Sequence, residues 1–348
     1  MNKTALFLKT KHIGDSVILT SAIAALPREF KVVDVVCLPD SKEIFEMNPR
    51  VRNIFVIPRD LKGLEKWKAY INVLRKIINN HYHFLAQFSG DWRGAILSRY
   101  FNAELSVVRK SSRRGYLWHK SFNLVANIFS IRRHMAEQDV DLLRVAGLFN
   151  DPEAPPYQLF APKSKLTEIK KWLFKNKISS NKKIVIIHAA SRWKFKELPI
   201  ATWIEVIQSL KLNRYNVILS GSKFDLDFNR SLVSQCKLKP LCAENFSIQD
   251  TAALYKLSDL VISIDSMSSH LASALQTPVV AIFGPTNEKN WAPWKVKHKV
   301  VSLSGEDNPS LACRPCGLDG CGGSKISHCL TLITPKSIIH EALKLLKR

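Results

Sequence analysis

The sequence predicts an α/β protein built from two doubly wound parallel sheets, and three observations support this class. Short β-branched runs alternate with amphipathic helical patterns along most of the 348 residues. A proline-rich segment interrupts that alternation near the middle of the chain. The hydrophobic content of 46% and charged content of 23% are typical of a globular protein, and the length fits two domains.

The first half begins with a strand, helix, strand pattern. We expect a strand at residues 5–8, a polar loop ending in Ile13-Gly14-Asp15, a helix over 16–26 and a strand at 32–36. Strands at 53–57 and 83–88 follow, with a helix over 64–79 between them. Alternation of this kind favours a parallel sheet.

Residues 150–163 contain four prolines and no periodicity, which indicates a linker. Beyond it we expect strands at 183–187, 216–220, 260–264 and 279–283, and helices at 165–175, 200–212, 226–236, 248–257 and 268–275. The predicted domains are 1–155 and 163–330, with a C-terminal helix in 331–348 that packs back on the first domain. Ligands of doubly wound sheets bind beyond the carboxyl ends of the strands, so the loops there are the candidate site.

The charge balance predicts an anionic partner. Lys and Arg number 52 against 29 Asp and Glu, a formal net charge of +23. Nucleic acid, an acidic membrane surface and a phosphorylated metabolite all fit this excess. The N-terminal residues lack a secretory pattern, no apolar run is long enough to span a membrane, and seven Cys are few for a disulfide scaffold. We therefore expect a soluble or peripheral protein in a reducing compartment.

The loop after the strand at 260–264 is a predicted anion site. Its residues 265–270, Asp-Ser-Met-Ser-Ser-His, lead directly into a helix, so backbone N–H groups and hydroxyls are expected to point at one spot. An ordinary serine N-cap is the alternative. Two further small-residue loops, Ser220-Gly221-Ser222 and Phe283-Gly284-Pro285-Thr286, end neighbouring strands. Three such loops at one sheet edge would suit a nucleotide diphosphate.

These motifs resemble glycosyltransferase family 9, the heptosyltransferases of lipopolysaccharide core assembly. The resemblance covers residues 264–274, Thr277-Pro278, residues 283–286 and the N-terminal loop at 9–15, and it extends from about Leu6 to Trp294. It implies a GT-B fold of two Rossmann-like domains, with the acceptor bound by the N-terminal domain and the nucleotide sugar by the C-terminal one. The spacing is most similar to the heptosyltransferase III branch.

The resemblance implies an inverting transfer of heptose from ADP-heptose to the inner core of lipopolysaccharide. The enzyme would be peripheral on the cytoplasmic face of the inner membrane of a Gram-negative bacterium, held by anionic lipid and without a nucleic-acid partner. Two alternatives remain open at this point. One is a family member that uses another nucleotide sugar or a protein acceptor, and the other is a basic nucleic-acid-binding protein.

Two catalytic residues follow from the resemblance. Asp15 matches the general base that removes the proton of the attacking sugar hydroxyl, with capping of the helix at Ser16 as the alternative. Lys196 matches the cation that contacts the donor diphosphate, with Lys194 as a competitor and Leu198 where the family often has Trp. A cation there can stabilise the leaving ADP, so we expect no cofactor for catalysis.

The implied donor site lies in the second domain. Met267 stands where many relatives have Gly, and Lys223 where relatives offer a carboxylate to the ribose. Asp225 could replace that carboxylate or simply cap a helix. The donor-binding residues expected are Ser191, Arg192, Gly221, Ser222, Asp265, Ser266, Met267, Ser268, Ser269 and His270.

The acceptor site is expected in the first domain. The stretch from Arg109 to Arg133 contains seven Lys or Arg, no Asp or Glu, and interleaved aromatic residues. By itself this pattern is typical of nucleic-acid binding or of a solvated basic face, whereas the resemblance favours a phosphorylated oligosaccharide on a lipid. The acceptor-binding candidates are Lys11, His12, Arg93, Arg113, Arg114, His119 and Lys120.

Four cysteines near the C-terminus form a separate candidate site. Their spacing is C-x₂-C-x₄-C-x₇-C, and their number and type suit a structural Zn or Fe ion. Free thiols or a redox-labile pair are the alternative. The residues are Cys313, Cys316, Cys321 and Cys329.

Overall fold

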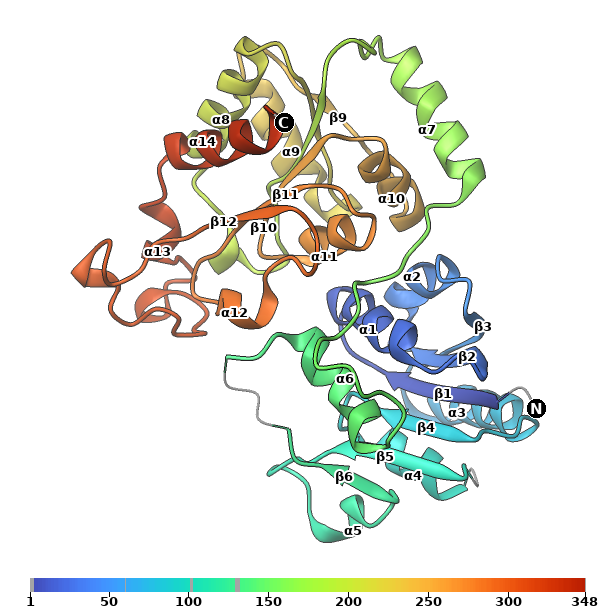
Figure 1. The fold of residues 1–348 in the computed structure, drawn as a ribbon. Coiled ribbons are helices and arrows are strands. Elements are labelled where there is room, and N and C mark those ends of the chain that lie inside the picture. The colour runs from blue at the N-terminus through green and yellow to red at the C-terminus, as the bar shows by residue number, and fades with distance from the viewer. Residues whose placement is uncertain (1–2, 60, 101–102, 129–131, 348) are drawn as a thin grey trace. The chain divides into compact units, whose positions relative to one another are not determined.

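The chain divides into two compact units, Met1–Phe160 and Ala161–Arg348, and the division falls inside the proline-rich segment (Figure 1). The computed structural model describes residues 3–59, 61–100, 103–128 and 132–347. The two units are described separately below.

The first unit is a six-stranded parallel sheet in the order β3-β2-β1-β4-β5-β6. Its strands are β1 (Lys3–Lys9), β2 (Phe30–Cys37), β3 (Val51–Val56), β4 (Phe84–Gln87), β5 (Leu105–Arg109) and β6 (Leu124–Ala126). Its helices are α1 (Ile13–Ala25), α2 (Lys42–Glu46), α3 (Gly63–Ile78), α4 (Trp92–Tyr100), α5 (Tyr116–His119) and α6 (Met135–Val145).

Helices cover both faces of this sheet. α1 and α6 pack together on one face, and the apolar residues of α3, α4 and α5 pack on the other (Figure 1). Leu6 and Leu85 of the sheet, Ile77 of α3 and the fully buried Trp118 of α5 belong to that second core. The strand order reverses between β1 and β4, so the carboxyl ends of these two strands mark the ligand-binding edge.

The second unit repeats the same plan. Its parallel sheet has the order β12-β11-β10-β7-β8-β9, and its strands are β7 (Ile184–His188), β8 (Asn216–Leu219), β9 (Leu241–Cys242), β10 (Leu260–Ile264), β11 (Val279–Ile282) and β12 (His298–Val301). Its helices are α7 (Lys163–Lys175), α8 (Ile200–Leu212), α9 (Leu226–Gln235), α10 (Ile248–Lys256), α11 (Met267–Ala274), α12 (Glu288–Trp291), α13 (His328–Thr331) and α14 (Pro335–Leu346).

Both sheets therefore place the first strand of the unit beside the fourth, which is the strand order of a Rossmann fold. In the second unit the reversal lies between β7 and β10, and the carboxyl ends of these strands form its ligand-binding edge. The predicted class, α/β with two doubly wound parallel sheets, is confirmed.

The C-terminal helix α14 packs within the second unit. α14 packs on α8 and on β10, β11 and β12, all of the second unit. Its residues Ile338, Ala342 and Leu345 are buried in the core of that unit. The apolar face of α14 is therefore used within the second unit.

Candidate active site

Asp15 lies in the first turn of α1, at the ligand-binding edge of the first sheet. The helix begins at Ile13 and not at Ser16, and its N-cap residue is His12, so the capping alternative for Asp15 is wrong. The carboxylate is 12% exposed. A negative charge in the first turn is stabilised by the N-terminal end of the helix dipole.

A buried lysine stands beside Asp15. Lys9 is the last residue of β1 and has no exposed surface, and its ammonium lies 3.9 Å from Asp15 Oδ1 and 2.7 Å from Asp139 Oδ2. Arg109, the last residue of β5, lies 3.6 Å from the other oxygen of Asp139. These ion pairs connect the carboxyl ends of two strands to α6, and they hold positive charge next to Asp15. A buried charge is tolerated only when it is paired in this way.

A cavity of about 610 Å³ opens at the same edge of the first sheet. It mixes basic, hydroxyl and aromatic side chains, which is suitable for a polar ligand that carries rings and negative charge. Lys11, in the loop that borders it, is exposed, and partial desolvation together with the neighbouring Lys9 lowers its pKa. The lining residues are Thr10, His12, Leu38, Pro58, Arg59, Tyr70 and Trp92.

The basic stretch predicted to bind the acceptor divides into structural and exposed members. Arg114 donates to Gly90 O at 2.9 Å. His119 accepts the backbone N–H of Ser111 on Nε2 at 3.2 Å, and its Nδ1 donates to Gly115 O at 3.0 Å. Trp118 is fully buried, so it is unavailable for stacking on a sugar. Arg113 and Lys120 are exposed, and Lys120 lies over the ring of Tyr116. The side chain of Arg93 lies outside the described residues.

In the second unit, Lys196 reaches the carboxyl end of β10. It ends a 3-10 helix, η2 (Lys194–Lys196), and its Nζ lies 2.6 Å from Oδ2 of Asp265, the residue after β10. Lys194 is instead paired with Glu197 at 3.0 Å and is 69% exposed. Of the two candidate cations, Lys196 is therefore the one at the strand edge. The backbone N–H of Ser191 donates to Glu197, and its hydroxyl accepts from Trp193 N.

The serines that begin α11 correct part of the anion-site prediction. Ser266 is the N-cap and accepts from Ser268 N at 3.3 Å. The hydroxyl of Ser269 donates to Ser266 O, and Ser268 bonds to Tyr255; both serines are fully buried. Their hydroxyls are therefore turned into the protein. The groups left to face an anion are the backbone N–H groups of the first helical turn other than that of Ser268.

A buried hydrogen-bonded chain lies beneath these loops. Tyr255 Oη lies between Ser220 Oγ at 2.9 Å and Ser268 Oγ, and Ser220 Oγ continues to His188 Nδ1 at 3.3 Å. The chain joins the ends of β7 and β8 to the start of α11. Burial raises the pKa of Tyr255 to about 12, so its hydroxyl keeps its proton and can bridge two partners. This chain fixes the spacing of the three loops.

The loop after β8 requires glycine and caps the following helix. A Cβ at Gly221 would lie 2.8 Å from the Asn229 side chain and 2.9 Å from Asp225 Cβ. Ser222 and Asp225 form a capping box at η3 (Lys223–Asp225), with Asp225 Oδ2 accepting from both the N–H and the hydroxyl of Ser222. The capping alternative for Asp225 is therefore observed.

His270 is a buried residue of α11 in the loop and helix start predicted to bind the donor. It is 3% exposed, and burial lowers its pKa to about 4. The negative charge of Asp265 opposes this shift, and the positive charge of Lys196 adds to it. The imidazole is therefore uncharged near neutral pH. It lies in α11 beside the ring of Trp291, so it packs the helix start and contributes no charge.

The cysteine segment does not form a preassembled metal site. In the described chain, which includes all four of these cysteines, no three of their sulfurs meet within 4.8 Å, and all four are free thiols. Burial raises the pKa of Cys329 to about 11. The nearby Cys321 and Cys316 raise it further, whereas the positive charge of Arg314 lowers it. The four thiols differ in exposure: Cys313 is exposed, Cys316 and Cys321 are half-buried, and Cys329 is buried.

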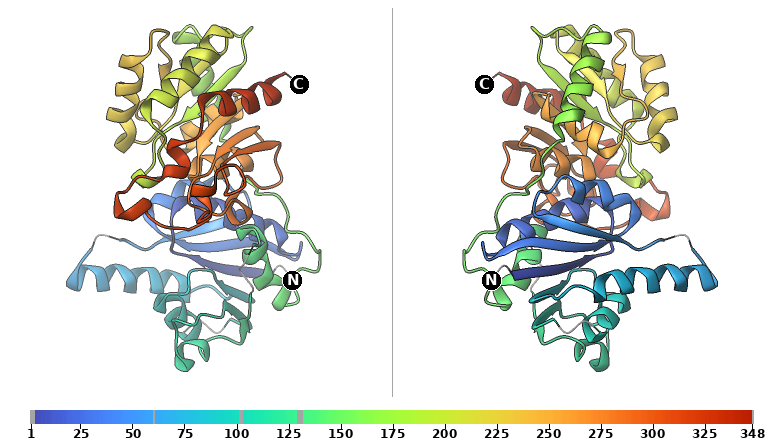
Figure 2. Two further views of the ribbon diagram at one scale, coloured as in Figure 1. Left: turned by 90° about the vertical axis from the view of Figure 1, so that its left-hand side faces the viewer. Right: turned by 90° about the vertical axis from the view of Figure 1, so that its right-hand side faces the viewer.

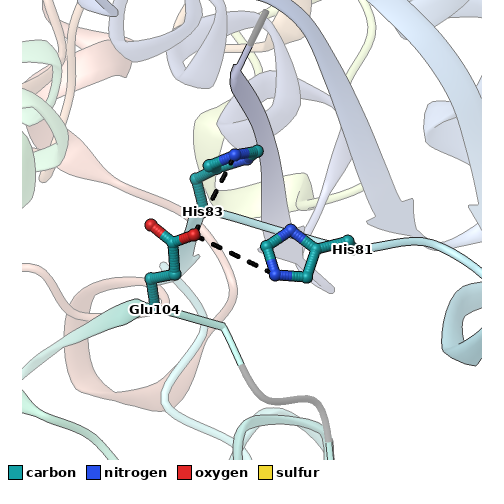
Figure 3. A group of neighbouring side chains, drawn as sticks. All are labelled: His81, His83 and Glu104. Atoms are coloured by element: carbon teal, nitrogen blue, oxygen red, sulfur yellow. Dashed lines mark ion pairs between the residues drawn. The ribbon is translucent and has the colours of Figure 1, made fainter. Parts of the chain in front are cut away.

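Another group of potential ligands lies at the amino ends of β1, β4 and β5. Within the described residues, His81, His83 and Glu104 are the one such group within 4.8 Å, and each imidazole Nε2 lies 4.0 Å from Glu104 Oε1 (Figure 3). However, His83 Nδ1 accepts the backbone N–H of Thr4 at 3.1 Å, which places the ring proton on Nε2. The nitrogen that faces Glu104 is therefore protonated and not available to a metal.

Comparison with known proteins agrees with this geometry. Residues 71–316 match glycosyltransferase family 9 (heptosyltransferase). The lipopolysaccharide heptosyltransferase 3 of Escherichia coli is 25% identical over 289 residues, which cover 81% of this chain and 83% of that protein.

Solved structures show the same fold. A family 9 glycosyltransferase of Veillonella parvula matches with a TM-score of 0.84 at 18% identity, covering 99% of this chain and 98% of that one. The E. coli heptosyltransferase WaaC with ADP-2-deoxy-2-fluoro heptose matches with a TM-score of 0.70 at 16% identity, covering 90% and 98%. The iron-containing E. coli glycosyltransferase TibC matches with a TM-score of 0.55 at 16% identity, covering 99% and 76%.

Two Rossmann-like units, each with polar loops at the carboxyl edge of its sheet, are the architecture of the GT-B fold. Within that class, the chain belongs to glycosyltransferase family 9, the heptosyltransferases. This membership decides in favour of an enzyme and against the alternative of a basic nucleic-acid-binding protein.

Several residues of these sites have no role predicted for them from the sequence. They are Lys9, Arg109 and Asp139 in the first unit and His188 and Tyr255 in the second. One signal was available: Lys9 is a charged residue that directly follows the apolar run at residues 5–8. The others depend on contacts between segments far apart in the chain.

Proposed function

We propose that this enzyme transfers heptose from ADP-heptose to the inner core of lipopolysaccharide, with the donor bound by the second unit and the acceptor by the first. Family membership supports this proposal, as do the E. coli relative named for lipopolysaccharide and the WaaC structure that holds an ADP-heptose analogue. The observation that carries it is the Lys196–Asp265 pair beside the N-terminus of α11.

The reaction is proposed as a single displacement with inversion. The acceptor hydroxyl attacks the anomeric carbon of the heptose, and Asp15 accepts the hydroxyl proton. The bond between the anomeric carbon and the phosphate oxygen breaks, and ADP leaves with that electron pair. Lys196 and the first-turn N–H groups of α11 stabilise the charge on the leaving diphosphate.

Two neighbouring pairs support these roles. The ammonium of Lys9 lies 3.9 Å from Asp15 and orients its carboxylate. Asp139 is the closer partner of Lys9, at 2.7 Å, and balances its charge. Asp265 holds Lys196 at the end of β10 before the donor arrives. No metal is needed in this scheme, because cationic and backbone groups bear the diphosphate charge.

The donor site is proposed to use backbone groups more than hydroxyls. In this proposal Gly221 lets the loop backbone approach the diphosphate, and Met267 allows a less close approach than the Gly of many relatives. Ser191 and Arg192 extend the proposed site beside Lys196. In the first unit, His12 lines the 610 Å³ cavity proposed for the acceptor, and Lys11, Arg113 and Lys120 supply charge for its phosphates.

The enzyme is proposed to act as a peripheral protein on the cytoplasmic face of the inner membrane of a Gram-negative bacterium. None of the helices that the structure describes combines the length and apolarity needed to cross a bilayer. The net charge of +23 supports attraction to anionic lipid.

A structural Zn or Fe ion at the four cysteines is a separate proposal. It is supported by their spacing and by the proximity of Cys316 and Cys321 to Cys329. Metal analysis of anaerobically purified enzyme decides it. One ion per chain that Cys316→Ser removes would support the site, and metal-free protein of full stability would refute it.

Nucleotide binding tests the donor assignment. ADP should raise the melting temperature and UDP should raise it much less, since a ligand at 100 times its Kd adds about 2.7 kcal/mol to the free energy of unfolding. Equal shifts with the two nucleotides would refute an ADP-sugar donor and favour the alternative of another nucleotide sugar.

A further inference from the structure

Helix α3 presents a line of large apolar side chains to solvent. Leu64, Trp67, Ile71 and Ile78 are 70%, 66%, 42% and 57% exposed. They recur at intervals of three, four and seven residues, so they lie along one stripe of the helix. Tyr70, Val73, Leu74 and Ile77 face the core of the first unit. Leu64, Trp67, Ile71 and Ile78 are here called the α3 stripe. They are therefore a second apolar surface of the helix, beside the face that packs on the core.

The α3 stripe continues onto the neighbouring helix α4. A groove of about 280 Å³ lies there, lined by Ile57, Trp67, Tyr70, Val73, Leu74, Ile96 and Leu97. On α4, Trp92, Ile96 and Tyr100 are spaced four residues apart and are 49%, 41% and 76% exposed. Both helices lie on the same face of the sheet, and Figure 2 shows α3 at the periphery of its unit. Extended apolar patches of this kind usually mark an interaction surface.

Basic residues flank this apolar surface. Residues 59–79 contain six Lys or Arg and two Asp or Glu. At 100° per residue, Lys68 and Arg75 lie directly beside the α3 stripe, and both are exposed, as is Lys76. An apolar stripe bordered by cations is complementary to a surface with an anionic headgroup layer above an apolar interior.

We propose that α3, with the adjoining face of α4, docks on the surface of an anionic phospholipid bilayer. The α3 stripe enters the boundary between headgroups and acyl chains, Trp67 sits at the interface, and Lys68 and Arg75 contact lipid phosphates. This inference rests on the proposed function in one respect: an acceptor carried by a lipid gives the enzyme a reason to dock.

Vesicle cosedimentation tests the proposal. Full-length enzyme is mixed with vesicles of phosphatidylcholine alone or with added phosphatidylglycerol. We expect binding to the anionic vesicles that weakens with salt. Trp67→Gln combined with Ile71→Gln should weaken partitioning tenfold or more. Lys68→Gln combined with Arg75→Gln should weaken it about fivefold per charge, on anionic vesicles only.

The matched control is Phe174→Gln. Phe174 is 86% exposed on α7, another basic helix, so it tests whether any exposed aromatic residue on a basic helix suffices. The control should bind vesicles as the unchanged enzyme does. Equal loss in the control, or normal binding by both α3 variants, would overturn the proposal. So would an α3 variant that turns a dimer into a monomer without changing vesicle binding, because the surface would then join two copies of the chain.

A transfer assay with a deacylated, water-soluble core acceptor separates this inference from the proposed function. The Trp67→Gln, Ile71→Gln enzyme should transfer heptose to that acceptor at the normal rate and with unchanged melting temperature. Vesicle binding without any transfer by the unchanged enzyme would refute the proposed function alone. Transfer without vesicle binding would refute the docking surface alone.

Discussion

Replacing Asp15 with Asn removes the proposed base while preserving the shape of the side chain. Asn cannot accept the proton of the acceptor hydroxyl, so the loss should fall on the chemical step. General base catalysis contributes roughly 10²–10⁴ in rate, equivalent to about 2.7–5.5 kcal/mol of activation free energy. Donor affinity should change little, because the proposed donor contacts lie in the second unit.

The cost in stability should be small for reasons visible in the structure. Lys9 keeps its 2.7 Å partner Asp139, and Asp15 is only the more distant carboxylate, at 3.9 Å. The lost charge in the first turn of α1 is worth about 0.3–1 kcal/mol. Glu65→Gln is a matched control, because Glu65 is also the third residue of its helix. It should show a similar stability change and no loss of turnover on a soluble acceptor.

Single-turnover kinetics and calorimetry with ADP measure the two effects separately. The expected result for Asp15→Asn is a slow chemical step with near-normal ADP affinity and a melting temperature close to that of the unchanged enzyme. A turnover rate within tenfold of normal would refute the base role. A large loss of stability would instead mean that Asp15 mainly neutralises Lys9.

Three further predictions concern the second unit. Lys196→Ala should weaken ADP binding ten- to a hundredfold, about 1.5–3 kcal/mol, and also slow turnover. Lys194→Ala should change the ADP affinity measured by calorimetry only a little. If Lys194→Ala instead caused the larger loss of affinity, the roles of the two lysines would be exchanged. Tyr255→Phe removes a hydroxyl that bridges two buried serines, so unfolding free energy should fall by about 1–3 kcal/mol and donor KM should rise; unchanged values of both would contradict a positioning role. The pKa of His270 is about 4 in the folded state and 6.5 in the unfolded state, so the unfolded chain binds the proton first as pH falls. The free energy of unfolding should therefore fall between pH 6.5 and pH 4, by about 3 kcal/mol at most. Urea titrations of His270→Gln should lack that part of the decline, and an identical decline would refute it.

The fold was predictable because its strands and helices differ in hydrophobic period. The strand at 260–264 and the helix at 200–212 have the predicted bounds, since each is a strongly apolar or strongly periodic segment bounded by polar residues. Between residues 89 and 149 the prediction named no element, and the structure has α4, β5, α5, β6 and α6 there. Helix α4 has weak amphipathicity, and β6 is only three residues long, so neither gives a clear pattern.

The candidate site was predictable where it depends on loops and motifs, and much less so where it depends on contacts. Lys196 and Asp265 come from segments that follow strand ends, and Asp15 comes from the first turn of the helix that follows β1. The direction of a hydroxyl does not follow from sequence, so Ser268 was expected to face the ligand but bonds inward to Tyr255. That partner is 13 residues away, on another helix, and no local pattern indicates it.

The most direct test of the central claim is a transfer assay with the purified enzyme, ADP-heptose and a lipopolysaccharide core that lacks its outermost inner-core heptose. Mass spectrometry of the product should show the acceptor heavier by one heptosyl unit, with stoichiometric release of ADP and no added metal. ADP release without a heavier acceptor, or transfer from a different nucleotide sugar in its place, would contradict the account.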